Sequence, residues 1–384
     1  MPNTSRIAII GTVASSIVGF RKPLIEKLIS QNHKVFAFAI DYDSNTEAQV
    51  LRLGAIPVSY HMDRGGVNPI SDLINMVKLA RKLKRFDIDI VFSYFSKPVI
   101  YGTIAAKLAN IRCRIGMLEG LGYAFTERPN GKTYRAAILK SIQIFLYRLS
   151  LPLLSQVIFL NPDDLKDLLI KHQIHTQNHH VLGGIGVNLR EFRYSPPLIT
   201  PITFLFIGRF LAEKGVNEFI AAARHLKINY PSARFVMLGQ PDNDNPGALS
   251  ETSLQTLVDN EVIICPGQVT DVRTWLDDSS VFVLPSYREG VPRSTQEALA
   301  VGRPVITTDA PGCRETVIDG VNGFLVKPGS VDELLDRMIY FLTNPDHIIK
   351  MGTASRRLAI EKFDENAVSQ RLVNLICNIS DFNE

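Results

Sequence analysis

Short apolar segments alternate with longer amphipathic segments along the first half of this chain, and this alternation constrains the fold most strongly. Repeated strand and helix patterns of this kind are typical of a parallel sheet covered by helices on both faces. The predicted strands are Arg6–Gly11, Val35–Ile40, Ile88–Ser93 and Val157–Leu160. The predicted helices are Lys22–Ser30, Pro69–Leu83 and Lys132–Leu149.

The same alternation restarts after Leu182–Pro201, a segment rich in glycine and proline that we interpret as an interdomain linker. The predicted strands are Thr203–Ile207, Arg234–Leu238, Val262–Cys265, Val281–Leu284 and Pro304–Thr307. The predicted helices are Val216–His225 and Arg293–Val301, with charged amphipathic helices from about Val331 onward.

These patterns predict two α/β domains, each a Rossmann-like doubly wound sheet, facing one another across a cleft. A length of 384 residues agrees, since one domain usually takes roughly 150 residues. We expect residues 1–185 and residues 186–364 to form these two domains. We expect residues 365–384 to form a helix that packs back on the first domain.

Composition excludes several classes of protein. Hydrophobic residues make up 46% and charged residues 21%, a globular balance without low complexity. A net charge of +4 is too mild to indicate a nucleic-acid-binding protein. The cysteines are scattered, which predicts no disulfide framework or metal site and fits a reducing cytosol. No export signal is visible at the N-terminus, so we expect a cytoplasmic protein.

The apolar run Ile142–Leu160 raises the question of membrane contact. Arg148 lies within it and Pro152 breaks a helix there, so a buried helix followed by a strand is favoured over a membrane span. The alternative is a surface that contacts lipid, peripheral on the cytoplasmic face of the inner membrane. Basic residues along this region fit that alternative or a solvated helix face: Lys132, Arg135, Lys140 and Arg148.

The segment Val281–Ile306 carries the most informative pattern. An apolar strand leads into a loop, and Pro292 stands where the first turn of a helix would begin. The backbone N–H groups at that helix start, at Arg293 and Ser294, form an anion site suited to a diphosphate. We assign Gly290 and Val291, in the same loop, to this predicted binding site as well.

Glu289 and Glu297 flank this predicted anion site with seven residues between them. Carboxylates there can accept hydrogen bonds from hydroxyl groups of a sugar on one side and a ribose on the other. The alternative is two chance surface carboxylates. The strand–turn–helix context favours the functional interpretation.

A second segment, Phe204–Ile220, places two cations after a predicted strand. Arg209 and Lys214 leave the carboxyl end of the strand and can converge on one anion. Two such cations would stabilise a leaving diphosphate without a metal ion. The alternative is a solvated basic loop.

These segments, GRFLAEKG and SYREGVPRSTQEALAVGRPVI, are followed by GCRETVIDGVNGFLV. Together they resemble the retaining GT-B glycosyltransferases that carry a Glu-x7-Glu motif, of the family 4 or group 1 type. The match is specific over roughly residues 183–363. The earlier stretches GFRKPLIEKL and LEGLG resemble bacterial enzymes that extend lipid-linked or surface polysaccharides.

The resemblance implies that residues 1–185 bind the acceptor and that residues 186–364 bind the nucleotide-sugar donor. It also implies roles for individual residues. The matches to Arg209 and Lys214 bind the donor diphosphate, and the match to Glu289 contacts the donor sugar. We take these three as the catalytic residues. The match to Glu297 binds the ribose, and the loop ending at Val269 resembles the one whose backbone holds the nucleobase.

The chain departs from many of these relatives on the acceptor side. Ser15 and Ser16 stand where relatives have paired glycines, and their hydroxyls can bind a phosphate or a sugar. Ser96 and Lys97 stand where relatives have a histidine near the reacting sugar, so the acceptor-side base is not identified.

Two further charged residues complete the predicted acceptor side. Arg21 can pair with an acceptor diphosphate or form a structural salt bridge. Glu119, in LEGLG, can reach the acceptor hydroxyl or serve as a simple turn carboxylate.

The resemblance implies transfer of an N-acetylhexosamine or hexose from a UDP-sugar to a glycan acceptor, with retention at the anomeric carbon. The expected acceptor is linked to polyprenyl diphosphate, in the synthesis of O-antigen, capsule or exopolysaccharide. We expect no cofactor and no metal requirement. Two alternatives remain open: a non-catalytic nucleotide-sugar-binding assembly protein and a GT-B sugar-nucleotide epimerase.

Overall fold

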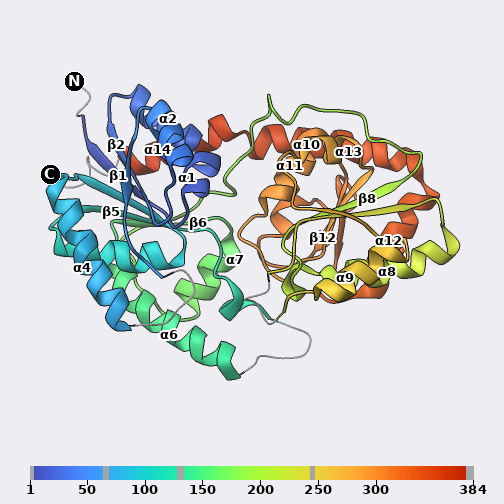
Figure 1. The fold of residues 1–384 in the computed structure, drawn as a ribbon, viewed down its shortest axis with the longest axis horizontal. Helices are drawn as coiled ribbons and strands as arrows, with labels where there is room; N and C mark the ends of the chain where they lie inside the picture. Colours follow the sequence, from blue (N-terminus) through green and yellow to red (C-terminus); the bar gives the residue numbers. More distant parts are fainter. Residues whose placement is uncertain (1–3, 64–68, 128–133, 243–246, 378–384) are drawn as a thin grey trace. The chain divides into compact units, whose positions relative to one another are not determined.

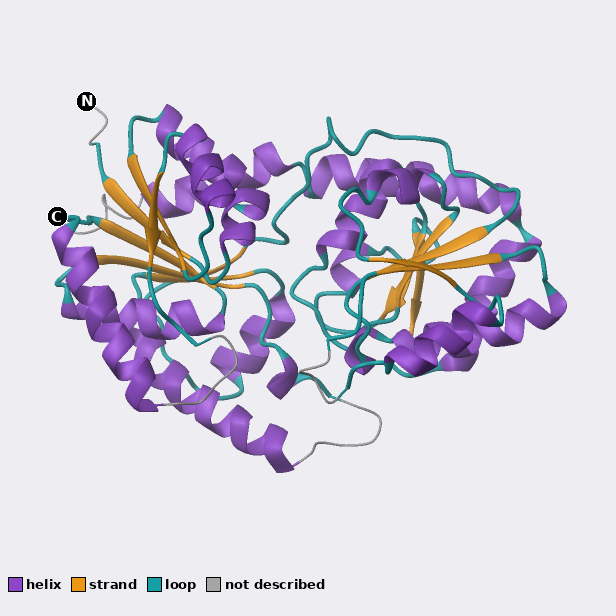
Figure 2. Cartoon of the chain, viewed as in Figure 1, coloured by secondary structure: helices purple, strands orange, loops and turns teal. Residues whose placement is uncertain are grey.

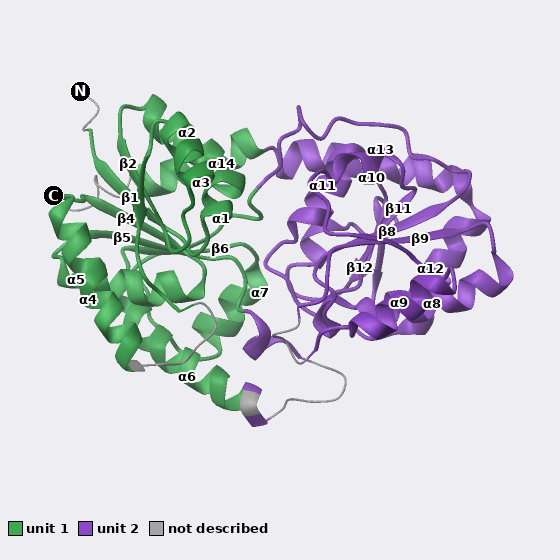
Figure 3. Ribbon diagram, viewed as in Figure 1, with its two compact units in different colours: residues 1–121, 137–185, 365–384 green, residues 122–136, 186–364 purple. Residues whose placement is uncertain are grey.

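The computed structural model describes residues 4–63, 69–127, 134–242 and 247–377, which form two compact units (Figures 1 and 3). Unit 1 comprises residues 1–121, 137–185 and 365–384, and unit 2 comprises residues 122–136 and 186–364. Each unit is an α/β body with helices on both faces of a parallel sheet (Figure 2). The predicted fold class is therefore confirmed.

The sheet of unit 1 has seven parallel strands in the order β3-β2-β1-β4-β5-β6-β7. The strands are β1 (Arg6–Ile10), β2 (Lys34–Ala39), β3 (Ile56–Ser59), β4 (Ile90–Tyr94), β5 (Cys113–Leu118), β6 (Gln156–Phe159) and β7 (His179–Val181). The helices are α1 (Ala14–Phe20), α2 (Lys22–Ser30), α3 (Ser44–Arg52), α4 (Pro69–Arg85), α5 (Thr103–Leu108), α6 (Tyr134–Ser150), α7 (Pro162–Leu165) and α14 (Glu365–Cys377).

The sheet of unit 2 has six parallel strands in the order β10-β9-β8-β11-β12-β13. The strands are β8 (Thr203–Ile207), β9 (Arg234–Leu238), β10 (Ile264–Gly267), β11 (Val281–Leu284), β12 (Val305–Thr308) and β13 (Gly323–Val326). The helices are α8 (Val216–Asn229), α9 (Glu251–Asp259), α10 (Arg273–Asp277), α11 (Arg293–Val301), α12 (Val331–Thr343) and α13 (Pro345–Lys362).

Apolar side chains on both faces of the central strands form the cores, as parallel sheets require. In unit 1, Phe36 and Phe38 of β2 are buried in a cluster that also contains Leu83 of α4. In unit 2, the rings of Phe204 and Phe235 stack with centroids 5.6 Å apart across β8 and β9. Continuous burial of this kind explains why the central strands read as apolar runs in the sequence.

Several elements differ from the sequence-based expectations. Strand β10 starts at Ile264 rather than Val262, and its pairing with β9 is interrupted by an irregularity between Ile264 and Gly267. The half-exposed side chain of Ile264 shows why hydropathy misplaces this edge strand. Strand β5 was not predicted because Cys113, Arg114 and Gly116 interrupt its apolar pattern.

The segment 122–136 lies in unit 2, whereas we expected residues 1–185 to form one domain. The Arg288 side chain donates to the Phe125 carbonyl, at 3.3 Å, and thereby ties this segment to the loop after β11. Sequence periodicity does not reveal such a long-range contact.

Helix α14 groups with unit 1. The Gln156 side chain in β6 donates to the Leu375 carbonyl, and Lys27 of α2 donates to Gln370, at 3.5 Å. The last helix therefore holds both a strand and a helix of unit 1.

Glycine at position 215 is required where two loops meet in unit 2. Gly215 precedes α8 with φ of 77°, and a Cβ atom there would lie 2.2 Å from the Pro285 carbonyl oxygen after β11. A side chain at this position would therefore meet both a strained backbone and a steric clash.

We predict that Gly215→Ala lowers the free energy of unfolding by about 2 kcal/mol or more, because the strain and the clash add. Urea denaturation followed by circular dichroism measures this loss. Gly19→Ala in α1 is the matched control, since nothing lies within 4 Å of the added methyl group. Equal stability of both variants would show that the loops at Gly215 separate freely.

Candidate functional site

The order of strands in unit 2 reverses between β8 and β11, which are neighbours in the sheet. In open α/β sheets, the loops that leave the carboxyl ends of such strands diverge and form a ligand-binding crevice. The loop after β8 runs to Lys214, and the loop after β11 runs to Pro292. The predicted donor residues therefore come from the position where this fold binds ligands.

Lys214 and Glu289, predicted from separate segments, form an ion pair at this position. The Lys214 ammonium lies 2.5 Å from Oε1 of Glu289, and both side chains are largely buried. The Ser286 hydroxyl donates to the same Oε1 atom, at 2.8 Å. Charged hydrogen bonds of this kind are short and geometrically specific, so the carboxylate of Glu289 is held in place.

Ser286 is a residue of the site that the sequence analysis missed. It is fully buried, and its carbonyl oxygen accepts hydrogen bonds from Thr308 and, at 3.6 Å, from the Cys313 thiol. Burial raises the pKa of Cys313 to about 12, so this thiol is a protonated donor at neutral pH. The only sequence signal for Ser286 was its place directly after the predicted strand end.

The loop that carries Glu289 is also held by the loop after β12. The Glu289 N–H donates to the Pro311 carbonyl, at 2.9 Å. Gly312 has φ of 75°, and a Cβ atom there would lie 2.1 Å from the Glu289 carbonyl oxygen. Backbone contacts thus place Glu289 before any ligand binds.

Arg209 has a different partner from Lys214. Its side chain is 62% exposed and donates to Oδ2 of Asp242, at 2.7 Å. Arg209 and Lys214 therefore pair with two different carboxylates, those of Asp242 and Glu289. A diphosphate that binds both cations would have to compete with Asp242 for one and with Glu289 for the other.

A pocket of about 340 Å³ opens beside Arg209, at the carboxyl ends of β8, β9 and β10. Its walls combine aliphatic side chains with two amides, a composition suited to a flat heterocyclic ring. Val269, predicted to lie near a nucleobase, lines this pocket. The full lining is Ile207, Gly208, Arg209, Leu238, Gly239, Gln240, Gln268, Val269 and Val272.

Helix α11 spans Arg293–Val301, as predicted, and Pro292 is its N-cap with an extended backbone rather than a residue of the first turn. Arg293 donates to Oε1 of Glu297 within the helix, at 2.9 Å. Burial raises the pKa of Glu297, and the charge of Arg293 opposes that shift. The hydroxyl of Ser294 donates to the Ile207 carbonyl, at 3.3 Å, and links this helix start to the end of β8.

Gln296 braces the loop that contains Gly290 and Val291. Its amide nitrogen donates to the Val291 carbonyl, at 3.0 Å, and its oxygen accepts from the Gly186 N–H, at 3.0 Å. Both Gly290 and Val291 are buried. A buried amide with both ends satisfied stiffens this loop, and nothing in the sequence pattern marked Gln296 for that role.

The equivalent position in unit 1 contains a buried cluster. Arg21 and Glu119 form an ion pair with side chains 2% and 9% exposed. The Arg21 guanidinium also lies over the ring of Tyr94, 4.3 Å from its centroid. We considered that Arg21 pairs with an acceptor diphosphate or forms a structural salt bridge, and its contacts are those of a structural salt bridge. Glu119 is the partner in this salt bridge and is therefore not an isolated turn carboxylate.

The two predicted serines differ in accessibility. Ser16 is buried, and its hydroxyl lies 2.7 Å from the Tyr94 hydroxyl and 2.7 Å from the Val13 carbonyl. Ser15 is exposed. Of this pair, Ser15 is therefore the accessible hydroxyl.

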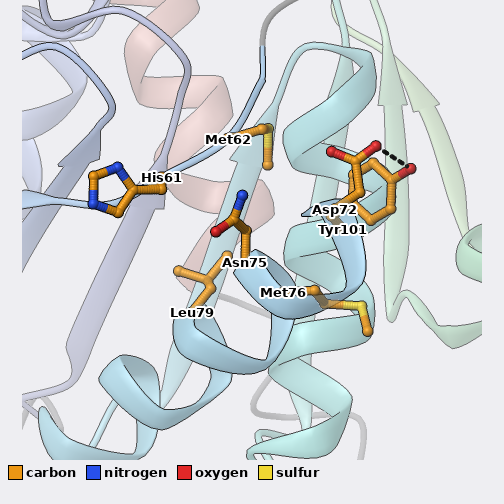
Figure 4. A pocket seen from close by; sticks show the side chains of 7 residues that line it. All are labelled: His61, Met62, Asp72, Asn75, Met76, Leu79 and Tyr101. Atoms are coloured by element: carbon orange, nitrogen blue, oxygen red, sulfur yellow. Dashed lines mark hydrogen bonds between the residues drawn. The ribbon is translucent and has the colours of Figure 1, made fainter. Parts of the chain in front are cut away.

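Ser96 and Lys97 follow β4 directly. The Lys97 ammonium donates to the Asp63 carbonyl, at 2.6 Å, and lies 3.6 Å from the buried carboxylate of Asp72. Tyr101 also donates to Asp72, at 2.9 Å, beside a cavity large enough for about one water molecule (Figure 4). Lys97 is therefore positioned by a buried carboxylate.

Comparison with known protein families finds a match within the second unit. Residues 191–358 match the family model described as glycosyl transferases group 1. This segment contains every predicted donor-side residue, from Arg209 to Glu297.

Curated relatives extend the likeness to the whole chain. An N,N'-diacetylbacillosaminyl-diphospho-undecaprenol alpha-1,3-N-acetylgalactosaminyltransferase of Campylobacter jejuni is 29% identical over 389 residues, covering 96% of this chain and 98% of that protein. A UDP-Gal:alpha-D-GlcNAc-diphosphoundecaprenol alpha-1,3-galactosyltransferase of Escherichia coli is 26% identical, covering 71% of both chains.

Solved structures agree on the fold. A glycosyltransferase from Rickettsia africae superimposes with a TM-score of 0.76 at 18% identity, covering all of both chains. Anabaena HepE in complex with UDP superimposes with a TM-score of 0.74 at 16% identity, covering 97% of this chain and 100% of that one. The GT-B fold is thus established.

We predict that Lys214→Met weakens binding of a nucleoside diphosphate by roughly tenfold to a hundredfold, the effect of losing one charged hydrogen bond. Isothermal titration calorimetry with UDP measures it. Lys327→Met removes a lysine from an exposed pair with Glu333 and is the matched control. Equal UDP affinity in the two variants would remove Lys214 from the diphosphate site.

Proposed function

We propose that this chain, whose residues 191–358 match the group 1 glycosyl transferases, is a member of that family and transfers an N-acetylhexosamine or hexose from a UDP-sugar to a lipid-linked glycan. The acceptor would be linked to polyprenyl diphosphate, and the product would enter a bacterial surface polysaccharide. The observation that carries the proposal is the buried Lys214–Glu289 pair at the strand-order reversal of unit 2. The near full-length Campylobacter relative, which is named for such an acceptor, supports the substrate class.

The proposed donor site uses the pocket beside Val269 for uracil and the start of α11 for the phosphates. A volume of about 340 Å³ has room for a nucleobase with its ribose. Glu297 would accept hydrogen bonds from the ribose hydroxyls, and its raised pKa reflects burial that hydroxyl donors would offset. A structural neighbour that binds UDP supports the choice of nucleotide.

The proposed mechanism requires stabilisation of the negative charge that develops on the leaving diphosphate. As the bond between the sugar and the diphosphate breaks, negative charge accumulates on the leaving phosphate, and Lys214 and Arg209 would stabilise it. Glu289, already oriented by Ser286, would position the donor sugar. The acceptor hydroxyl would attack the anomeric carbon from the same face that the diphosphate leaves, so the anomeric configuration would be retained. The leaving phosphate would take the proton of that hydroxyl, and no metal ion would be needed.

The acceptor would approach unit 1 near the carboxyl ends of β1 and β4. Ser15 has an exposed side chain there, and Lys97 follows the end of β4 by three residues. Because a polyprenyl chain stays in the bilayer, the enzyme would work as a peripheral protein at the cytoplasmic face of the membrane.

We predict that UDP, the nucleotide bound by the structural neighbour HepE, binds at least about tenfold more tightly than GDP or ADP. Glu297→Ala should weaken UDP binding about tenfold through the lost ribose contact. Calorimetry with the three nucleotides measures both effects. Glu333→Ala, on the exposed start of α12, is the matched control. Equal binding of the three nucleotides would contradict the UDP assignment.

We also predict that sugar transfer persists in excess EDTA and that the new linkage keeps the donor's α configuration. Cations of the protein would replace a metal at the leaving diphosphate. Transfer to a synthetic prenyl-diphosphate-linked sugar, followed by chromatography and by proton NMR of the anomeric signal, measures both. Loss of turnover that magnesium restores would refute metal independence, and a β linkage would refute retention.

A further inference from the structure

Helix α6 presents a continuous apolar stripe to solvent. Its large side chains recur at intervals of three or four residues, which places them on one face of the helix. Their exposed fractions range from 38% to 82%, whereas comparable side chains are usually buried. The stripe consists of Tyr134, Ile138, Ile142, Phe145 and Leu149.

The charged residues of α6 are all basic. Between Tyr134 and Ser150 the helix contains no aspartate or glutamate, and its described basic side chains are Lys140 and Arg148. Arg148 is exposed and donates to the His172 carbonyl, at 3.2 Å. An apolar face bordered by cations is complementary to a surface of lipid tails and anionic headgroups.

The packing of α6 favours contact along a membrane over passage through it. The stretch Ala136–Leu153 is long and apolar enough to span a bilayer. However, Tyr147 and Ser150 are fully buried, so one face of the helix packs against the protein. The 17 residues of α6 span about 26 Å, shorter than the ~30 Å hydrocarbon core.

The packed face of α6 connects to the proposed acceptor side. Gln143 donates to the Tyr147 hydroxyl, at 3.1 Å, and to the Leu121 carbonyl, at 3.5 Å. Burial raises the pKa of Tyr147 to about 12, while its hydrogen bond with Ser96 opposes the shift. The helix therefore contacts segments that follow β4 and β5, where the acceptor would bind.

We propose that α6 is the membrane-binding element of this protein and lies in the plane of an anionic bilayer surface, with its apolar stripe among the acyl chains. Figure 1 draws α6 at the outer margin of unit 1, beyond the helices that cover the sheet. The link to a lipid-borne acceptor rests on the proposed function, whereas the binding surface rests on the exposure and charge of α6.

Vesicle co-sedimentation of the full-length protein tests the proposal. We expect binding to vesicles of phosphatidylethanolamine and phosphatidylglycerol, and weaker binding to phosphatidylcholine alone. The double variant Ile138→Ser and Phe145→Ser should lower the partition coefficient roughly a hundredfold, and Phe145→Ser by itself about tenfold. Lys140→Gln should cause a smaller loss that is greatest at low salt.

A matched control removes exposed apolar side chains elsewhere. Ile228→Ser in α8 together with Ile360→Ser in α13 likewise replaces two large apolar side chains by serine, at positions that are 79% and 53% exposed. This variant should bind vesicles like the wild type. Thermal unfolding of every variant confirms that the fold is retained, and the single Phe145→Ser variant keeps the test valid if the double variant does not fold.

Two results would overturn the proposal. One is unchanged vesicle binding by the α6 variants. The other is a change in oligomeric state by analytical ultracentrifugation with vesicle binding intact, which would show that the stripe contacts a second copy. UDP affinity and transfer to a water-soluble acceptor should be unchanged in the α6 variants. If the wild type itself lacks both activities, the proposed function fails, whereas the vesicle result still decides the role of α6.

Discussion

The ion pair between Lys214 and Glu289 depends on the parallel strand order of unit 2, and the proposed donor site depends on this pair. β8 and β11 are neighbours although about seventy residues of chain separate them, so their following loops leave the sheet side by side. Gly215 permits the close approach of these loops, because a larger residue would clash with the Pro285 carbonyl. Ser286 then fixes the carboxylate with a buried hydroxyl.

The charged residues near the strand-order reversal differ in exposure between the two units. In unit 2 the ion pairs near it are partly exposed, and Arg209 lines an open pocket. In unit 1 the ion pair of Arg21 and Glu119 is buried against Tyr94. Removing one partner of a buried pair leaves an unbalanced charge, so these two residues give rigidity to the loops that the acceptor would contact. Accessible groups, such as Ser15, remain for binding.

Helix α6 has one face that packs against unit 1 and another that exposes apolar side chains. Tyr147 and Gln143 hold one face against the segments after β4 and β5. The opposite face exposes apolar side chains that a water-soluble protein normally buries. A helix with a packed face and a lipid-facing one would hold the acceptor loops close to the bilayer in which a polyprenyl diphosphate resides.

The sequence by itself determined the fold class, most central strands and the loops that carry Arg209, Lys214, Glu289 and Glu297. Local periodicity and the position of loops after strands encode these features. Only the tertiary structure decided which charges pair: Lys214 with Glu289, Arg209 with Asp242, and Arg21 with Glu119. It also decided which face of α6 is exposed. Such pairings join residues far apart in the chain, and they follow from strand order and packing, which local patterns do not contain.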